Sequence, residues 1–193
     1  FVKEIITKQK KLKNRKPYKN LYVSIGRLTK QKNFIFLLQC FKKIVEVNKN
    51  NYLYILGEGE DFYKLRDFIK KNNLEKNVYL KGYKENVYEY LFNSKAFILS
   101  SLWEDPGFVL IEAGYSNTTL ISSDCENGPK EILDKNKNGF LFKSNNHSSF
   151  LEVFESFQKT DTKEINIKKI NAKKMSRKFS LFSHYCELSK ILN

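Results

Sequence analysis

Short apolar runs alternate with segments of helical periodicity through most of the chain. Each run is three to five residues long and ends close to a glycine or a polar residue, which is typical of a buried strand. The predicted strands are residues 21–25, 52–56, 78–80, 96–100, 119–123 and 139–142. Between them, apolar residues recur at helical spacing. The predicted helices are residues 33–47, 60–72, 86–92, about 107–116 and 129–133, followed from about residue 147 by helical sequence with a weaker pattern.

Strands that alternate with helices predict an α/β fold, here a Rossmann-like, doubly wound parallel sheet of about six strands with helices on both faces. Right-handed crossovers place the carboxyl end of every strand at one edge, so the loops that follow the strands should line a common rim. We expect residues 20–160 to form this domain and residues 161–193 to form C-terminal helices. Residues 1–19 are basic and poor in pattern, and we expect a linker from an N-terminal domain that lies outside this sequence.

The composition limits the class of protein. Hydrophobic residues make up 41% of the 193 residues, which is enough for a packed core. No segment reaches the roughly 18 apolar residues that a membrane span needs. The three cysteines (Cys40, Cys125 and Cys186) are isolated, which favours a reducing, cytosolic setting and argues against a zinc site. The chain begins FVKEII rather than with Met, so we expect it to be a fragment of a longer protein.

The net charge of +14 comes mostly from lysine. AT-rich coding bias would enrich lysine, asparagine and isoleucine, so the charge fits either such a bias or a selected basic surface. A selected surface would suit an anionic membrane or anionic substrates. Proteins that bind single-stranded nucleic acid expose aromatic residues, whereas here most aromatics fall on the apolar faces of predicted elements. Nucleic acid is therefore the less favoured partner.

Two cations follow the first predicted strand. In the segment SIGRLTKQKNF, Arg27 and Lys32 lie between a strand end and a helix start, where free backbone N–H groups already favour anions. Arginine can hold a phosphate with two parallel hydrogen bonds, and lysine adds a point charge. Solvated surface charge is the alternative, because loop cations are common in a lysine-rich chain.

Two glutamates eight positions apart mark a second candidate site. Pro106 and Gly107 lie between Glu104 and Glu112, so the two glutamates cannot share one regular helix. Glu104 is therefore expected in the loop after strand 96–100, and Glu112 in the second turn of the next helix. One carboxylate would face the mouth of a strand–helix crevice, where open α/β sheets bind nucleotides, and the other would lie just inside it. A solvent-exposed Glu112 that merely suits the helix dipole is the alternative.

Taken together, these motifs resemble the C-terminal half of a GT-B glycosyltransferase of family four (glycosyltransferase group 1), with matching order from about residue 20 to 192. The matching motifs are Gly26-Arg27 with Lys32, Gly57-x-Gly59, Gly82 after VYL, and the E-x7-E pair Glu104 and Glu112. The segment SDCENGPKEIL further resembles family members that use UDP-linked N-acetylhexosamines. One departure is Asp105-Pro106-Gly107, where the family commonly has Phe-Gly.

The resemblance implies a role for each matching residue. Arg27 and Lys32 would hold the diphosphate of a nucleotide sugar, and Glu112 would hold its ribose. Glu104 would contact the donor sugar and the distal phosphate, so the implied catalytic residues are Arg27, Lys32 and Glu104. The implied donor-binding set is Gly26, Arg27, Lys32, Gly57, Gly82, Tyr83, Ser101, Glu104, Gly107, Phe108, Val109 and Glu112, where Gly82 and Tyr83 would meet the base and Gly107, Phe108 and Val109 would act through their backbone.

The implied function is that of the nucleotide-sugar-binding half of a retaining glycosyltransferase. It would move a hexose or N-acetylhexosamine from a UDP-sugar to a glycan or lipid-linked acceptor in bacterial lipopolysaccharide, capsule or other cell-surface polysaccharide synthesis. No cofactor or metal is expected, and the chain has no Asp-x-Asp pair of the metal-chelating kind. The protein would be cytoplasmic, with peripheral contact to the inner face of the membrane as an option.

The acceptor would bind through the N-terminal domain, so this chain alone is expected to bind UDP weakly and to transfer little or nothing. Two alternatives stay open on the sequence. One is a non-catalytic, basic module that binds nucleic acid or other anions. The other is a GT-B nucleotide-sugar epimerase, against which the Arg27 and Lys32 pair together with the E-x7-E motif favours a transferase.

Overall fold

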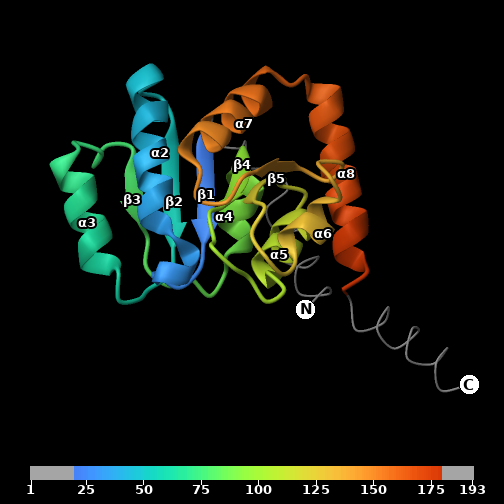
Figure 1. Cartoon of the computed structure of the whole chain (residues 1–193), viewed down its shortest axis with the longest axis horizontal. Helices are drawn as coiled ribbons and strands as arrows, with labels where there is room; N and C mark the ends of the chain where they lie inside the picture. Colours follow the sequence, from blue (N-terminus) through green and yellow to red (C-terminus); the bar gives the residue numbers. More distant parts are fainter. Residues whose placement is uncertain (1–19, 180–193) are drawn as a thin grey trace, which may run out of the picture.

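The structure, a computed structural model, describes residues 20–179 and contains a six-stranded, all-parallel sheet (Figure 1). The strand order is β3-β2-β1-β4-β5-β6. The strands are β1 (Leu21–Ile25), β2 (Tyr52–Leu56), β3 (Val78–Leu80), β4 (Ala96–Leu99), β5 (Thr119–Ser123) and β6 (Phe140–Phe142). The α/β doubly wound fold expected from the sequence is confirmed.

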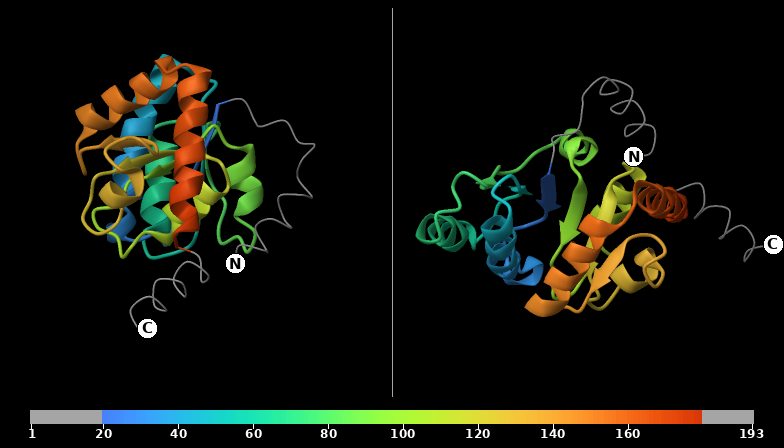
Figure 2. Two further views of the ribbon diagram at one scale, coloured as in Figure 1. Left: turned by 90° about the vertical axis from the view of Figure 1, so that its right-hand side faces the viewer. Right: turned by 90° about the horizontal axis from the view of Figure 1, so that it is seen from above.

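Helices cover both faces of the sheet (Figure 2). The helices are η1 (Lys30–Lys32), α2 (Phe34–Val47), α3 (Phe62–Lys71), α4 (Tyr88–Asn93), α5 (Phe108–Tyr115), α6 (Pro129–Leu133), α7 (His147–Lys159) and α8 (Thr162–Arg177). One hydrophobic core lies beneath α2, α3 and α7, and the other beneath α4, α5, α6 and α8. The two layers arise because successive side chains of a strand point to opposite faces. Tyr22 belongs to the first core, whereas Leu21 and Val23 belong to the second.

The strand order creates a switch point between β1 and β4. The chain winds from β1 outward to β3, then crosses back to place β4 on the other side of β1, where Tyr22 pairs with Ala96. The loops after β1 and β4 therefore leave the same edge of the sheet in opposite directions. In open α/β sheets the crevice outside the carboxyl ends of such strands is where ligands bind.

The C-terminal helix α8 belongs to the second layer and packs closely on α5. A Cβ placed on Gly114 of α5 would lie 2.5 Å from the Ser176 Oγ of α8, so only glycine allows the helices to come this near. Ala172 of α8 is buried in the same contact. The first half of the expected C-terminal helices thus packs against the Rossmann-like domain. The expected linker at 1–19 and the remainder of the tail from 180 lie outside the described residues.

Within residues 20–179 no helix combines the length and apolarity that a membrane crossing requires.

Candidate functional site

An ion pair bridges the switch point of the sheet. The Lys32 Nζ lies 2.5 Å from the Glu104 Oε1, and the two side chains are 13% and 4% exposed. Lys32 ends η1, which follows β1, and Glu104 lies in the loop that follows β4. The topology therefore brings together two residues that are 72 positions apart, both of them implied as catalytic by the family resemblance.

Hydrogen bonds fix the two loops against each other. The Leu102 amide donates to the Gln31 carbonyl at 2.8 Å, and the Gln31 Nε2 donates to the Trp103 carbonyl at 3.0 Å. The Ser100 hydroxyl donates to the Lys32 carbonyl at 2.8 Å. These contacts hold the two loops together, so the backbone of Lys32 lies at a fixed distance from the backbone of Glu104.

Ser101 holds the Glu104 carboxylate from below. Its hydroxyl, in a side chain with no exposed surface, donates to the Glu104 Oε1 at 2.5 Å. The Ser101 carbonyl in turn accepts from the Ser123 hydroxyl at 2.7 Å. Ser101 was expected beside the site. In the structure Ser101 is buried, and its hydroxyl contacts Glu104 instead of solvent.

The loop from Glu104 turns directly into helix α5. Gly107 caps the helix with φ +85°, a left-handed conformation that glycine adopts without strain. The first N–H groups of a helix have no partner within it, and this cap residue supplies no side chain to satisfy them. The amides of Phe108 and Val109 therefore lie where they can donate to an anion near Glu104.

A cavity of about 350 Å³ opens beside Arg27, on the β2 side of the switch point. It is lined by Ile25, Gly26, Arg27, Leu56, Gly57, Glu58, Tyr83, Lys84 and Val87. The glycine turns pack tightly here, because a Cβ on Gly57 would collide with the Gly26 carbonyl oxygen. The Gly57 amide donates to the Gly82 carbonyl at 2.9 Å, which ties the ends of β2 and β3 together. Tyr83 is 69% exposed at the cavity mouth.

Glu112 lies in the second turn of α5, as expected, and is half-buried. Burial raises the pKa of its carboxyl group, while a hydrogen bond with the Tyr88 side chain opposes this rise. Tyr88 begins α4 and directly follows Val87, which lines the cavity beside Arg27. Neither Tyr88 nor Glu112 is among the residues that line this cavity.

The structure adds two residues that the sequence did not single out for this site. Glu58 lines the cavity and accepts a long hydrogen bond of 3.4 Å from the Tyr83 amide. Cys125, after β5, is buried, and burial is the main cause that raises the pKa of its thiol, on which the nearby charges of Glu104 and Lys32 also act. Glu58 could have been found from its place between Gly57 and Gly59, and Cys125 from its place in the segment SDCENGPKEIL.

Among residues 20–179, no group of three or more histidine, cysteine, aspartate or glutamate side chains is arranged to hold a metal ion. The candidate site is made of cations, helix N–H groups and the separate carboxylates of Glu58, Glu104 and Glu112. This combination can bind an anion and, beside it, a hydroxyl-rich group.

Known proteins resemble this chain in sequence and in fold. The chain is 44% identical over 124 residues to an uncharacterised glycosyltransferase of Methanocaldococcus jannaschii, covering 61% of this chain and 30% of that protein. It is 30% identical over 156 residues to an Escherichia coli protein named UDP-Gal:alpha-D-GlcNAc-diphosphoundecaprenol alpha-1,3-galactosyltransferase, covering 79% of this chain and 40% of that protein.

Among solved structures, a Staphylococcus aureus TarM mutant in complex with Fondaparinux, alpha-GlcNAc-glycerol and UDP has the same fold. The TM-score is 0.79 at 24% identity, with 93% of this chain and 36% of that chain covered. The chain thus spans between 30% and 40% of the length of these relatives.

The family model described as Glycosyl transferases group 1 matches residues 5–175, which is most of the sequence. The expected resemblance is confirmed, and the six-stranded parallel fold agrees with that of these relatives. The chain therefore belongs to the group 1 glycosyltransferases and corresponds to a C-terminal-type domain of the GT-B fold.

Proposed function

We propose that this chain is the nucleotide-sugar-binding half of a retaining, metal-independent glycosyltransferase. It binds a UDP-sugar whose hexose or N-acetylhexosamine passes to a glycan or lipid-linked acceptor in cell-surface polysaccharide synthesis. The observation that carries the proposal is the Lys32–Glu104 pair at the switch point, with Arg27 and the start of α5 beside it.

The chemistry follows from charge. When the bond between sugar and phosphate breaks, negative charge grows on the diphosphate that leaves. Arg27, Lys32 and the amides of Phe108 and Val109 can stabilise this charge without a metal ion. Because Lys32 already touches Glu104, a bound diphosphate would share its ammonium group, which has three donors.

The other parts of the donor fall to neighbouring residues. Glu104 lies beside Gly107 and is proposed to accept hydrogen bonds from the donor sugar. The backbone of Gly82 and Tyr83, at the cavity mouth, is proposed to meet the base. Glu112 is proposed to accept hydrogen bonds from the ribose hydroxyls, a common use of carboxylates in nucleotide-binding folds.

The relatives support uridine as the nucleoside. The TarM mutant was solved with UDP, and the E. coli relative carries UDP-Gal and a diphosphoundecaprenol acceptor in its name. A lipid-linked acceptor of that kind would place the whole enzyme in the cytoplasm at the inner face of the membrane.

Calorimetric titration of the 193-residue chain with UDP tests the proposal. We expect binding with low affinity, and loss of that binding in Arg27→Ala and Lys32→Ala. Lys70→Ala, which removes an exposed lysine from the last turn of α3, should bind like the parent. In the full-length enzyme, removal of either cation should raise the barrier to transfer by about 3–4 kcal/mol, and a chelator should leave the rate unchanged.

The proposal fails if the folded chain shows no heat at millimolar UDP. Binding to DNA or RNA with a steep salt dependence and no preference for UDP would instead support an anion-binding module. Isomerisation of a UDP-sugar by the full-length protein, without release of UDP, would indicate an epimerase.

A further inference from the structure

The outward face of α8 carries lysines around two exposed isoleucines. Ile167 is 57% exposed and Ile170 is 51% exposed. With Lys163 and Lys174 they follow the spacing 163, 167, 170 and 174, which is one face of a helix. This face lies opposite Ala172 and Ser176, the residues that pack α8 against α5. The name basic strip is used below for Lys163, Ile167, Ile170, Lys174 and Lys178.

The charge of the basic strip is of one sign. Helix α8 contains six basic residues and a single glutamate, Glu164. Glu164 pairs with Lys168 at 3.4 Å, on a different side of the helix. In the described part of the chain, the side chains of Lys163, Lys174 and Lys178 form no ion pair. Their positive charge is therefore available to an external anion.

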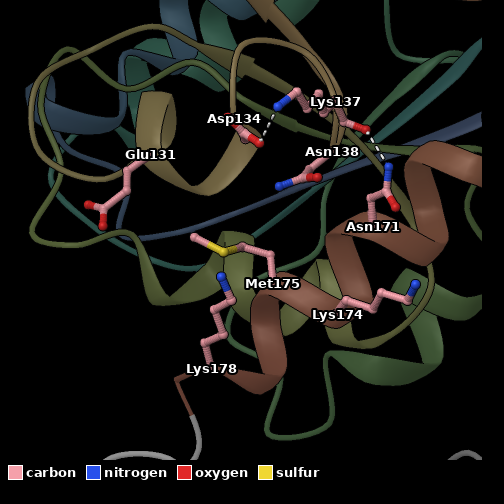
Figure 3. Close-up of a pocket in the computed structure, with 8 residues that line it drawn as sticks. All are labelled: Glu131, Asp134, Lys137, Asn138, Asn171, Lys174, Met175 and Lys178. Atoms are coloured by element: carbon pink, nitrogen blue, oxygen red, sulfur yellow. Dashed lines mark hydrogen bonds and ion pairs between the residues drawn. The ribbon is translucent and has the colours of Figure 1, made fainter. Parts of the chain in front are cut away.

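A pocket of about 460 Å³ lies along the flank of the basic strip, between α8 and the α6–β6 region (Figure 3). Its lining residues are Glu131, Asp134, Lys137, Asn138, Asn171, Lys174, Met175 and Lys178. Lys137 is turned toward Asp134, with their charged atoms 3.2 Å apart, whereas Lys174 points away from both acids. Lys174 and Lys178 therefore belong to both the strip and the pocket.

We propose that the basic strip docks on a lipid bilayer that contains anionic lipids. The lysines attract the negative surface, each raising the affinity roughly five-fold when it lies close to the headgroups. The isoleucines enter the boundary between headgroups and acyl chains, which removes their apolar surface from water. Long lysine side chains lie along an apolar surface and keep their charge at the headgroups.

The arrangement favours a bilayer over other anionic partners. A nucleic acid would use the lysines but would leave two isoleucines exposed in the middle of the contact. A bilayer uses both kinds of residue at once. Helix α8 also runs along the flank of the domain and ends level with the edge at which the ion pair lies (Figure 1). Docking through α8 would hold that edge near the membrane surface.

Vesicle flotation of the 193-residue chain tests this inference. The chain should float with vesicles of phosphatidylcholine mixed with phosphatidylglycerol, and not with phosphatidylcholine alone. The variant Lys174→Gln with Lys178→Gln should bind the mixed vesicles roughly thirty-fold more weakly. The variant Ile167→Ser with Ile170→Ser should lose about ten-fold.

The chain offers matched controls for both variants. Lys70 and Lys71 are a lysine pair in the last turn of α3, at the opposite edge of the sheet, and their change to glutamine should leave vesicle binding unaltered. Val47 is 90% exposed at the end of α2, so Val47→Ser tests whether any exposed apolar residue matters. Circular dichroism melting of each variant should match the parent, because none of these side chains is buried.

Several outcomes would overturn the inference. Equal flotation with both kinds of vesicle would show that anionic lipid plays no part. If the Lys70 and Lys71 control lost vesicle binding as strongly as the Lys174 and Lys178 variant, the effect would be one of net charge alone. Loss of a dimer in the isoleucine variant, seen by light scattering, would make the strip an interface between copies. Retention on RNA by the parent and the isoleucine variant alike would assign the lysines to nucleic acid.

The docking inference goes beyond the proposed function and does not rest on it. The same variants should bind UDP as the parent does, because the basic strip lies away from Arg27 and Lys32. Loss of vesicle binding with normal UDP affinity supports docking. If neither the parent nor any variant binds UDP, the donor proposal fails. The vesicle-binding result is then still valid evidence for docking.

Discussion

At the scale of single residues, the Glu104 carboxylate depends on the buried hydroxyl group of Ser101. Glu104 is 4% exposed, and a buried carboxylate is costly unless it has hydrogen-bond partners. Lys32 and Ser101 both donate to the Oε1 atom of Glu104, so removal of either leaves the Glu104 carboxylate with fewer partners. The site is therefore sensitive to changes that never touch a ligand.

The Ser101→Ala variant should be less stable and should bind a UDP-sugar more weakly than the parent. Hydrogen bonds to charged groups contribute about 1.5–3 kcal/mol, and we expect a loss of stability in that range. Urea unfolding measures it. Ser116→Ala is the matched control, because Ser116 is also buried but donates to the neutral Glu112 carbonyl. It should cost about 1 kcal/mol. A Ser101→Ala variant that matches this control in stability and affinity would remove the proposed support of Glu104.

The pKa of Glu112 predicts how donor binding depends on pH. Burial raises that pKa above the ordinary value of 4.5, so Glu112 takes up a proton at a higher pH than an exposed glutamate does. A protonated carboxyl group loses acceptor capacity for the ribose hydroxyls. Affinity for a UDP-sugar should therefore fall as the pH is lowered through the raised pKa. Glu112→Gln should bind weakly at neutral pH, with a flatter pH profile, and an unchanged profile would show that Glu112 is not the titrating group.

The same shift predicts an opposite effect on stability. Because the folded pKa is raised, the folded state holds the proton more tightly than the unfolded state does. Ionised Glu112 therefore destabilises the fold as pH rises through that pKa. Glu112→Gln should unfold at a higher temperature than the parent near pH 7, and the difference should shrink toward acid pH. A parent that is as stable as the variant at neutral pH would contradict this cause.

At the scale of elements, the close contact of α5 and α8 depends on a single glycine. A Cβ on Gly114 would lie 2.5 Å from the Ser176 Oγ and 3.2 Å from the Ala172 carbonyl. Gly114→Ala should therefore destabilise the protein by about 1–3 kcal/mol, as overpacking usually does. Adding Ser176→Ala removes the closest atom and should recover part of the loss. Chemical denaturation of the four proteins of this cycle measures the coupling, and strictly additive effects would rule out the contact.

The elements themselves could be predicted well, and the exceptions have physical causes. Buried parallel strands are short apolar runs, so the six predicted strands match the observed ones to within a residue at either end. Helix η1 was not predicted, because three residues hold too little pattern to be seen. Helix α8 showed a weak pattern because it packs through Ala172 and Ser176 rather than through large apolar residues. Close packing by small residues removes the periodic signal on which such predictions depend.

The candidate site could be predicted only in part. Residues 27, 32, 104 and 107 could be assigned to one edge of the sheet, because parallel strands end there together. The ion pair between Lys32 and Glu104 could not be derived, since it depends on β4 lying beside β1. The support that Ser101 gives to Glu104 depends on the burial of Ser101. The position of Glu58 in the cavity lining depends on the distance between neighbouring turns. The assignment of each residue to a part of the donor stays a prediction.

For the molecule as a whole, we predict that this chain binds its donor but does not transfer the sugar. The site is built on one edge of one sheet and is open to water, since Tyr83 is 69% exposed and Phe108 is 64% exposed. Water screens the charge of the exposed Arg27, so this open site can hold a diphosphate weakly but stabilises the developing charge much less than an enclosed site would. The chain also spans only 30% to 40% of the relatives to which it aligns.

Release of UDP from a panel of UDP-sugars measures this directly. The chain should show UDP binding by calorimetry and no release above the rate in buffer, with or without a lipid-linked acceptor. The control is a full-length group 1 glycosyltransferase with its own acceptor, which should release UDP under the same conditions. Steady acceptor-dependent release by this chain alone would contradict the prediction. It would mean that Arg27, Lys32 and Glu104 form a complete catalytic site without a second domain.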